Sequence, residues 1–200
     1  MRTVTADEPT VQGEQPPHRH RITLEDYHRM MEVGLLAPRS RVELIEGEIV
    51  DLAPRGHAHR RVVMRLDALL REAVGTQATV LCPAPIRLGA DSEPEPDLAV
   101  VRAPPDAHPN ARPTGADALV LIEVSDTTWH YDHDIKVPFY ARHGIPEVWL
   151  FDLSRATAHF FRGLAEGHYT DETATDRPGL TFLPGLTDLA VDLSGLLPTA

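Results

Sequence analysis

Three carboxylic acids and one lysine carry the chemistry that this sequence could perform. Asp97 and Glu123 each lie beside a short apolar run, Glu43 lies within an earlier one, and Lys136 follows in a polar stretch. Carboxylates brought into one place repel each other unless one holds a proton or a cation bridges them. Hard oxygen ligands without cysteine favour Mg²⁺ or Mn²⁺ over zinc. These residue types therefore indicate a site for a hard divalent cation.

Such a site would suit the hydrolysis of a phosphate ester. A bound divalent ion lowers the pKa of water and clamps a phosphate oxygen, and a nearby lysine can steady the nucleophile or the developing charge. Ordinary structural roles are the alternative. Glu43 could pair with Arg41 or Arg39 across a sheet, Lys136 could be an i,i+4 partner of Asp132, and the other two acids could close a turn or cap a strand.

The central unit that must position these residues runs from 119 to 152. We expect a buried strand at Leu119–Val124, a helix around Phe139–Ala141 and a second strand at Glu147–Asp152. Strand, helix and strand form a βαβ-like unit, and ligands tend to bind where such strands end. Pro138 favours the first turn of the helix, which would place Lys136 near the end of the first strand.

The partner strand is expected at Leu98–Val101, directly after Asp97. The 25 residues between Asp97 and Glu123 permit two neighbouring strands joined by a Pro-rich loop at 102–117. The other expected elements are a Thr23-capped helix from Leu24, a hairpin of 41–45 and 48–52, an amphipathic helix His59–Val74, strands at 78–81 and 86–88, and a hairpin of 157–162 and 168–170. Segment 180–197 receives no firm assignment.

Aromatic and imidazole side chains offer weaker signals. His57 and His59 precede a helix, so we expect them to cap it or to contact a phosphate rather than to bind zinc. Trp129 could stack on a base or anchor its loop. Tyr140 and Trp149 are expected in the core.

Composition bounds the class of protein. Two hundred residues with 42% hydrophobic content suit one compact α/β domain, which we place at 22–197 behind a disordered lead-in at 1–21. Cys82 is the single cysteine, no apolar stretch could span a bilayer, and the first twenty residues lack a secretion signal. We therefore expect a cytoplasmic protein without a membrane partner. Its net charge of −11 means that any contact with DNA must come from a local basic patch.

Several short motifs together resemble a known family. In order they are Glu95-Pro96-Asp97-Leu98, Ile122-Glu123-Val124-Ser125, Asp132-x-x-x-Lys136, Tyr140-Ala141 and Gly144-Ile145-Pro146-Glu147-Val148-Trp149. From about Ile22 to Tyr169 the sequence resembles the Uma-type endonucleases of the PD-(D/E)XK, or restriction-endonuclease-like, superfamily. The resemblance implies an α/β fold with a mixed central sheet flanked by helices and additional β-hairpins.

The resemblance also implies residue roles. Asp97 and Glu123 would bind Mg²⁺ or Mn²⁺, the backbone carbonyl of Val124 would complete the site, and Glu43 would assist directly or through water. The superfamily lysine usually lies two residues after the second acid, where this chain has Ser125; its counterpart here is Lys136. The implied function is hydrolysis of DNA phosphodiester bonds by a homodimer, since duplex cutters commonly pair two sites by symmetry.

Two other functions stay open from the sequence. A nuclease-like fold could bind nucleic acid or a protein without cutting, which the negative charge favours and the intact acids oppose. The same site could hydrolyse some other phosphate ester.

Overall fold

The computed structural model describes residues 19–37, 40–102, 112–186 and 188–197. Its centre is a six-stranded sheet in the order β3-β4-β5-β6-β7-β8, in which β5 and β6 are parallel and all other neighbours are antiparallel. The strands are β3 (Ala78–Leu81), β4 (Leu98–Arg102), β5 (Ala118–Ser125), β6 (Val148–Asp152), β7 (Thr157–Ala165) and β8 (His168–Thr175). The mixed α/β sheet expected from the sequence is confirmed.

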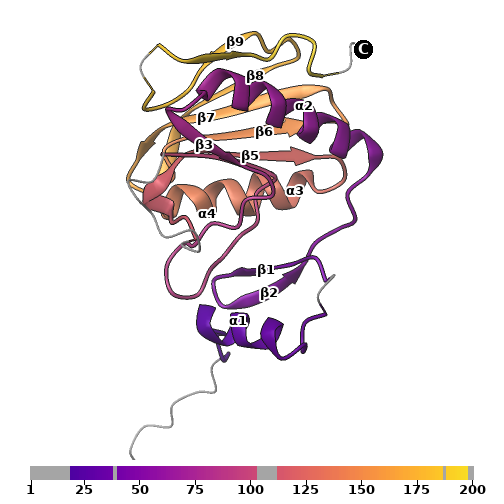
Figure 1. Ribbon diagram of the computed structural model, residues 1–200, viewed down its shortest axis with the longest axis vertical. Coiled ribbons are helices and arrows are strands. Elements are labelled where there is room, and N and C mark those ends of the chain that lie inside the picture. The colour runs from indigo at the N-terminus through magenta and orange to yellow at the C-terminus, as the bar shows by residue number, and fades with distance from the viewer. Residues whose placement is uncertain (1–18, 38–39, 103–111, 187, 198–200) are drawn as a thin grey trace, which may run out of the picture.

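Helices cover both faces of this sheet (Figure 1). On one face α2 (His57–Val74) packs together with the C-terminal segment that contains β9 (Leu180–Phe182) and β10 (Ala190–Asp192). Val62, Leu66 and Leu70 of α2 recur at helical spacing, so they lie on one side of the helix, and this side is buried against the sheet. The other face is covered by α4 (Val137–Arg142), which follows α3 (Trp129–Tyr131) and the π-helical turn η2 (Asp132–Lys136).

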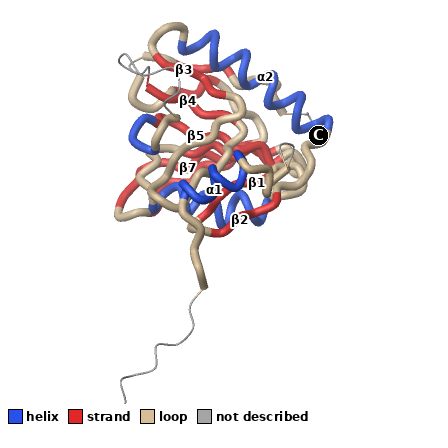
Figure 2. Tube along the Cα trace, turned by 60° about the horizontal axis from the view of Figure 1, so that its bottom comes forward, coloured by secondary structure: helices blue, strands red, loops and turns tan. Residues whose placement is uncertain are grey.

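A hairpin of β1 (Val42–Ile45) and β2 (Glu48–Asp51) lies with α1 (Leu24–Glu32) at one end of the molecule (Figures 1 and 2). Glu46 and Gly47 form its turn, both with positive φ, as a two-residue turn of type I′ requires. The hairpin is tied to the segment before β4, where the Glu93 N–H donates to the Leu44 carbonyl at 2.8 Å. This tie holds β1 close to the sheet.

Most expected elements are found at or near their predicted bounds. The cap of α1 is confirmed, since Thr23 Oγ1 accepts from the Asp26 N–H at 3.1 Å. Helix α2 begins two residues earlier than expected, at His57, and ends before Gly75. Both hairpins form, and the second is longer than predicted. Segment 180–197, which the sequence left open, contributes the pair β9 and β10.

Two local predictions were wrong. Residues 86–88 form no strand; Arg87 makes only an isolated bridge to Thr114, just before the short 3₁₀ turn η1 (Gly115–Asp117). Helical structure begins at Trp129 rather than near Val137, so Lys136 does not lie in a first turn.

Most of the expected lead-in (1–18) and of the Pro-rich loop (103–111) lies outside the described residues. Among the helices that the structure describes, none is long and apolar enough to cross a membrane.

Candidate active site

The register of β4 and β5 brings the two acids together. Leu98 pairs with Ile122 in this antiparallel ladder, so Asp97, one residue before β4, lies opposite Glu123. Directly opposite residues have their Cβ atoms about 4.5–5.5 Å apart. Alternation along both strands places the two acids on the face covered by α4. Asp97 and Glu123 therefore lie opposite each other on the same side of the sheet.

Asp97 is held by three donors. Its Oδ2 lies 2.9 Å from His59 Nε2 and accepts the Val124 N–H at 2.9 Å, whereas its Oδ1 lies 3.0 Å from Arg55 Nη2. Burial raises the pKa of this carboxyl, but the hydrogen bond and charge of His59 and the charge of Arg55 outweigh it, and the net shift is downward. Asp97 is therefore an ionised carboxylate that requires a cation beside it.

Glu123 has a different environment. Its side chain is buried, and its Oε1 accepts the Tyr140 hydroxyl at 2.6 Å and lies 2.7 Å from Lys136 Nζ. Burial, with smaller contributions from the negative charges of Asp132 and Asp97, raises the pKa of Glu123 to about 8 against the opposing effect of Lys136. Its Oε2 accepts no hydrogen bond from the residues that the structure describes. That oxygen is the one available to a ligand.

Lys136 is buried between two acids. Besides Glu123, its Nζ lies 3.2 Å from Glu43 Oε2. Burial lowers the pKa of Lys136, but the carboxylates of Glu123 and Glu43 outweigh that effect and raise it well above its ordinary value. The lysine is not a surface partner of Asp132, which instead accepts a hydrogen bond from the Thr128 hydroxyl. Its ammonium group therefore lies at the site, buried between Glu123 and Glu43, whereas its neighbour Ile135 is exposed.

Glu43 is fully buried, and it does not pair with Arg41. Its Oε1 accepts the Tyr131 hydroxyl at 2.8 Å, and its Oε2 accepts the Glu95 N–H at 3.0 Å and pairs with Lys136. Both oxygens are thus committed in this arrangement. The contacts of Glu43 fix the lysine, and neither oxygen is free for direct coordination of a metal ion.

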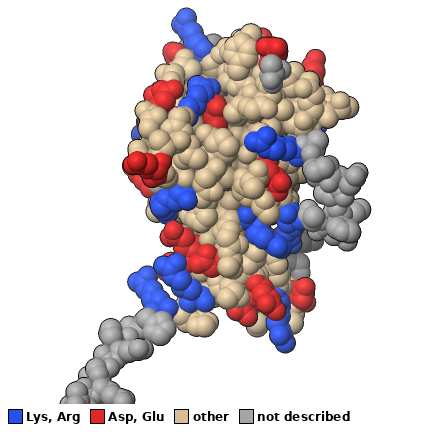
Figure 3. Space-filling model, turned by 90° about the vertical axis from the view of Figure 1, so that its left-hand side faces the viewer, with Lys and Arg blue, Asp and Glu red and all other residues tan. Residues whose placement is uncertain are grey.

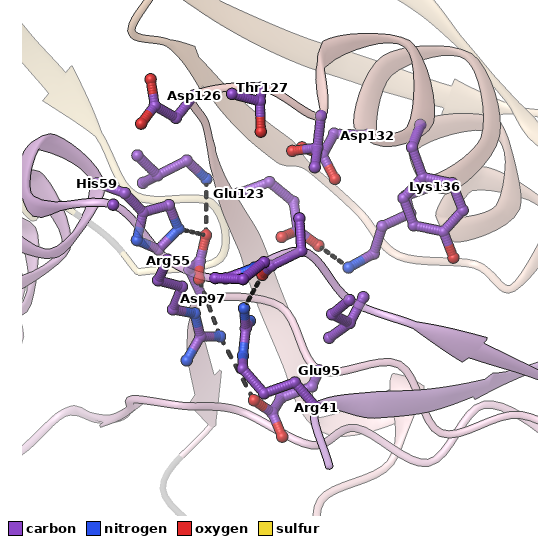
Figure 4. A pocket seen from close by; sticks show the side chains of 17 residues that line it. Arg41, Arg55, His59, Glu95, Asp97, Glu123, Asp126, Thr127, Asp132 and Lys136 are labelled. Carbon is purple, nitrogen blue, oxygen red and sulfur yellow. Dashed lines mark hydrogen bonds and ion pairs between the residues drawn. The ribbon is translucent and has the colours of Figure 1, made fainter. Parts of the chain in front are cut away.

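A small cavity opens beside these side chains (Figure 4). Its volume of about 60 Å³ has room for a few water molecules or a partly hydrated ion. Asp97, Glu123 and Lys136 line it, together with polar side chains from the flanking segments that include Arg41, Arg55, Glu95, Asp126, Thr127 and Thr128.

The donors at the cavity fit a hard divalent cation. Within the described residues no three His, Cys, Asp or Glu side chains are arranged to hold a metal ion, so Asp97 and Glu123 would need help from the backbone. Val124 can give it. Its N–H points toward Asp97, and in a strand its carbonyl points the same way, toward the opposite residue Pro96, which has no N–H to donate. Two carboxylates, one carbonyl and water suit Mg²⁺, which usually keeps several waters.

Several site residues were not found from the sequence. His59 was expected to cap α2 or to contact a phosphate, but it is buried and its Nε2 lies beside Asp97. Its spacing from Val62 and Leu66 places it on the inner face of the helix, and this spacing could have indicated its burial. No pattern in the sequence indicated that Arg55 belongs to the site. Tyr140 lies in the core as expected, yet its hydroxyl donates a hydrogen bond to Glu123.

Trp129 is not placed to stack on a base. Its ring stacks on His133 at 4.7 Å, and the Arg155 guanidinium lies 5.5 Å from its centroid. The loop-anchor alternative agrees with these contacts.

Residues 24–194 match the family model Uma2, described as a putative restriction endonuclease. The chain belongs to this family. The fold of the Uma2 chain is similar to the crystal structure of a putative nuclease belonging to DUF820 from Anabaena variabilis, with a TM-score of 0.68 and 18% sequence identity over 88% of this chain and 97% of that chain. The search of curated proteins gave no match. The resemblance inferred from the motifs is confirmed.

Proposed function

We propose that this Uma2-family protein is a Mg²⁺-dependent endonuclease, able to use Mn²⁺, that hydrolyses DNA phosphodiester bonds at the edge formed by Asp97 and Glu123. The observation that carries the proposal is that Asp97 and Glu123 lie opposite each other and that buried Lys136 contacts Glu123. An ordinary structural ion pair would need one acid, whereas here Lys136 contacts Glu123 and Glu43 while Asp97 lies opposite.

Each residue has a role that follows from its contacts. Asp97, Glu123 and the Val124 carbonyl would hold the divalent ion, which when bound supplies an activated water and a Lewis acid for the phosphate. His59 fixes the carboxyl plane of Asp97. Lys136 orients the attacking water and stabilises negative charge as it develops on the phosphate. Glu43 holds Lys136 in place and would reach the metal only through water.

The polynucleotide substrate is supported by the charge on α2. Arg60, Arg61 and Arg65 lie on its exposed face, and none of them pairs with an acid among the described residues. Arg60 and Arg65 are five residues apart, about 7.5 Å along a helix, or roughly two nucleotide steps of one DNA strand. The side of the molecule in Figure 3 instead mixes both signs of charge. These arginines form a local basic patch on α2, whose N-cap Gly56 and residue His59 line the cavity, despite the net charge of −11.

Cutting both strands of a duplex takes two sites of opposite polarity, so we also propose a homodimer with two-fold symmetry. A DNA substrate and a single cysteine, Cys82, suit the cytoplasm.

The test is Mn²⁺-supported nicking of supercoiled plasmid by wild type, Lys136→Met and Lys136→Arg, with Glu123→Ala as the inactive control. We expect Lys136→Met to lower the rate by about 10²–10³-fold, as for loss of one transition-state donor. Lys136→Arg should recover it only in part, because a planar guanidinium places its charge differently.

Folding must be measured alongside activity. Lys136 is buried between two acids, so Lys136→Met should cost about 3–5 kcal/mol of stability. Rates are therefore compared at a temperature where circular dichroism shows each variant folded. A folded Lys136→Met that cuts like wild type would remove the lysine from the mechanism. Plasmid binding without nicking by wild type would favour the module that binds without cutting.

A further inference from the structure

Arg55 occupies the place where a metal ion would approach Asp97. It lies between β2 and α2, directly before Gly56, the N-cap of α2. Its Nη2 is 3.0 Å from Asp97 Oδ1 and 3.4 Å from Glu95 Oε1. Its buried Nε has no hydrogen-bond partner among the described residues. Figure 4 shows this guanidinium reaching Asp97 from the side away from Lys136.

The two oxygens of Asp97 are not equivalent. Oδ2 is already satisfied by His59 and the Val124 N–H, whereas Oδ1 has Arg55 as its partner. Oδ1 is therefore the oxygen that Asp97 can offer to a divalent cation. A guanidinium and a divalent ion cannot share it at contact distance without strong repulsion between like charges.

We infer that Arg55 is an internal counter-ion for Asp97, which neutralises the carboxylate while no metal is bound and leaves Oδ1 when the metal binds. This inference rests on the proposed metal-dependent function. It makes metal binding a competition between two cations for one oxygen, so Arg55 weakens the affinity of the site for metal.

The displaced side chain has a place to go. Glu95 lies within reach at the mouth of the cavity and is partly exposed, so a small shift transfers the guanidinium from Asp97 to Glu95. There its planar donors face the opening, where they match the oxygens of a phosphate. Metal binding would thus free Arg55 for the substrate, and metal and phosphodiester would bind cooperatively.

The experiment measures Mn²⁺ binding to the full chain without nucleic acid, by the electron paramagnetic resonance signal of free Mn²⁺. We expect Arg55→Met, which keeps an apolar stem and removes the charge, to bind Mn²⁺ about tenfold more tightly than wild type. Arg55→Gln provides a second variant should Arg55→Met fail to fold, and it should shift affinity in the same direction.

Arg41→Met is the matched control. Arg41 lines the same cavity, but its guanidinium donates to the Ala53 carbonyl and contacts neither Asp97 nor Glu95. Its removal takes away one positive charge at a similar place, and we expect less than about a twofold change in Mn²⁺ affinity. A gain in Arg41→Met equal to that in Arg55→Met would show a general field effect and overturn the competition.

Failures of the two proposals can be told apart. Wild type that binds Mn²⁺ and nicks plasmid, with Arg55 variants of unchanged or weaker Mn²⁺ affinity, would overturn the inference and leave the nuclease proposal standing. Absence of Mn²⁺ binding by wild type and both Arg55 variants at millimolar concentration would overturn both.

Discussion

The buried carboxyl of Glu123 should make the metal-free protein lose stability as the pH rises. Its pKa is about 8 in the folded chain against an ordinary value of 4.5. Between these values the native state holds a proton that the unfolded state has released, so the free energy of unfolding falls with increasing pH. Glu123→Gln removes this titration and keeps a side chain of similar shape.

The magnitude follows from the two pKa values. A change from 4.5 to about 8 corresponds to about 5 kcal/mol at 1.36 kcal/mol per pH unit. This is an upper limit, because Lys136 and the cavity water respond when Glu123 ionises. We expect the stability of Glu123→Gln relative to wild type to rise by about 2–4 kcal/mol between pH 5 and pH 8.5.

Urea unfolding at half-unit pH intervals, in the presence of a chelator, measures this difference. Other buried acids with raised pKa values, Asp132 and Glu147, are present in both proteins and largely cancel. At pH 5 Glu123 is mostly protonated in the native state. The difference in free energy of unfolding at that pH therefore comes mainly from the substitution itself and little from the titration of Glu123. A difference that stays flat across the range would mean that Glu123 titrates normally, and it would refute the argument from burial.

Three further results are expected. Mg²⁺ at ten times its dissociation constant should stabilise wild type at pH 8 by about 1.4 kcal/mol and Glu123→Ala by much less, as read from melting temperatures. Glu43→Ala should cost about 3–5 kcal/mol in urea unfolding because it strips one acid from buried Lys136, whereas Glu48→Ala, an exposed acid on the same hairpin, should cost under about 1 kcal/mol. Gly47→Ala should destabilise more than Gly34→Ala, since both glycines have positive φ but only at Gly47 would the new Cβ meet Arg21, at 2.6 Å; equal losses in urea unfolding would exclude the clash.

The strands that hold Asp97 and Glu123 could be predicted because their signal is local. Continuous apolar runs at 98–101 and 119–122 describe strands buried on both faces, and acids at their ends are conspicuous. Segment 86–88 alternates apolar and charged residues, a pattern typical of a strand, without forming one. Ile86 and Leu88 are buried and Arg87 is exposed, as in a strand, but the Ile86 and Leu88 N–H groups donate to the Pro94 and Ser92 carbonyls in an irregular loop. The alternation of buried and exposed side chains is present there, and the expected backbone pairing is not.

The remaining parts of the site depend on contacts between distant segments. His59 and Arg55 reach Asp97 from a helix and a loop about forty residues earlier, and no local pattern encodes that approach. The helix from Trp129 was missed because its first two turns are polar and mix aromatic with charged residues, so they lack an apolar period. The position of Lys136 came from the family resemblance, whereas its burial came from the structure.

The π-helical turn η2 sets the rotational phase of the helix that carries the lysine. Asp132, Lys136 and Tyr140 follow at steps of four, and the last two meet the same oxygen of Glu123. A π-type turn holds one residue more than an α-helical turn, so deletion of the exposed Ile135 would leave room for regular α-helix. Each residue of an α-helix turns about 100°. Deleting one residue from the π-type turn would thus keep Tyr131, on Glu43, and Lys136 in nearly the same rotational phase. An added residue would instead rotate everything before it by that angle relative to Lys136. The length of this turn is therefore constrained as well as its residue identity: an insertion here should inactivate the protein even when every site residue is retained, whereas deletion of Ile135 should be tolerated better.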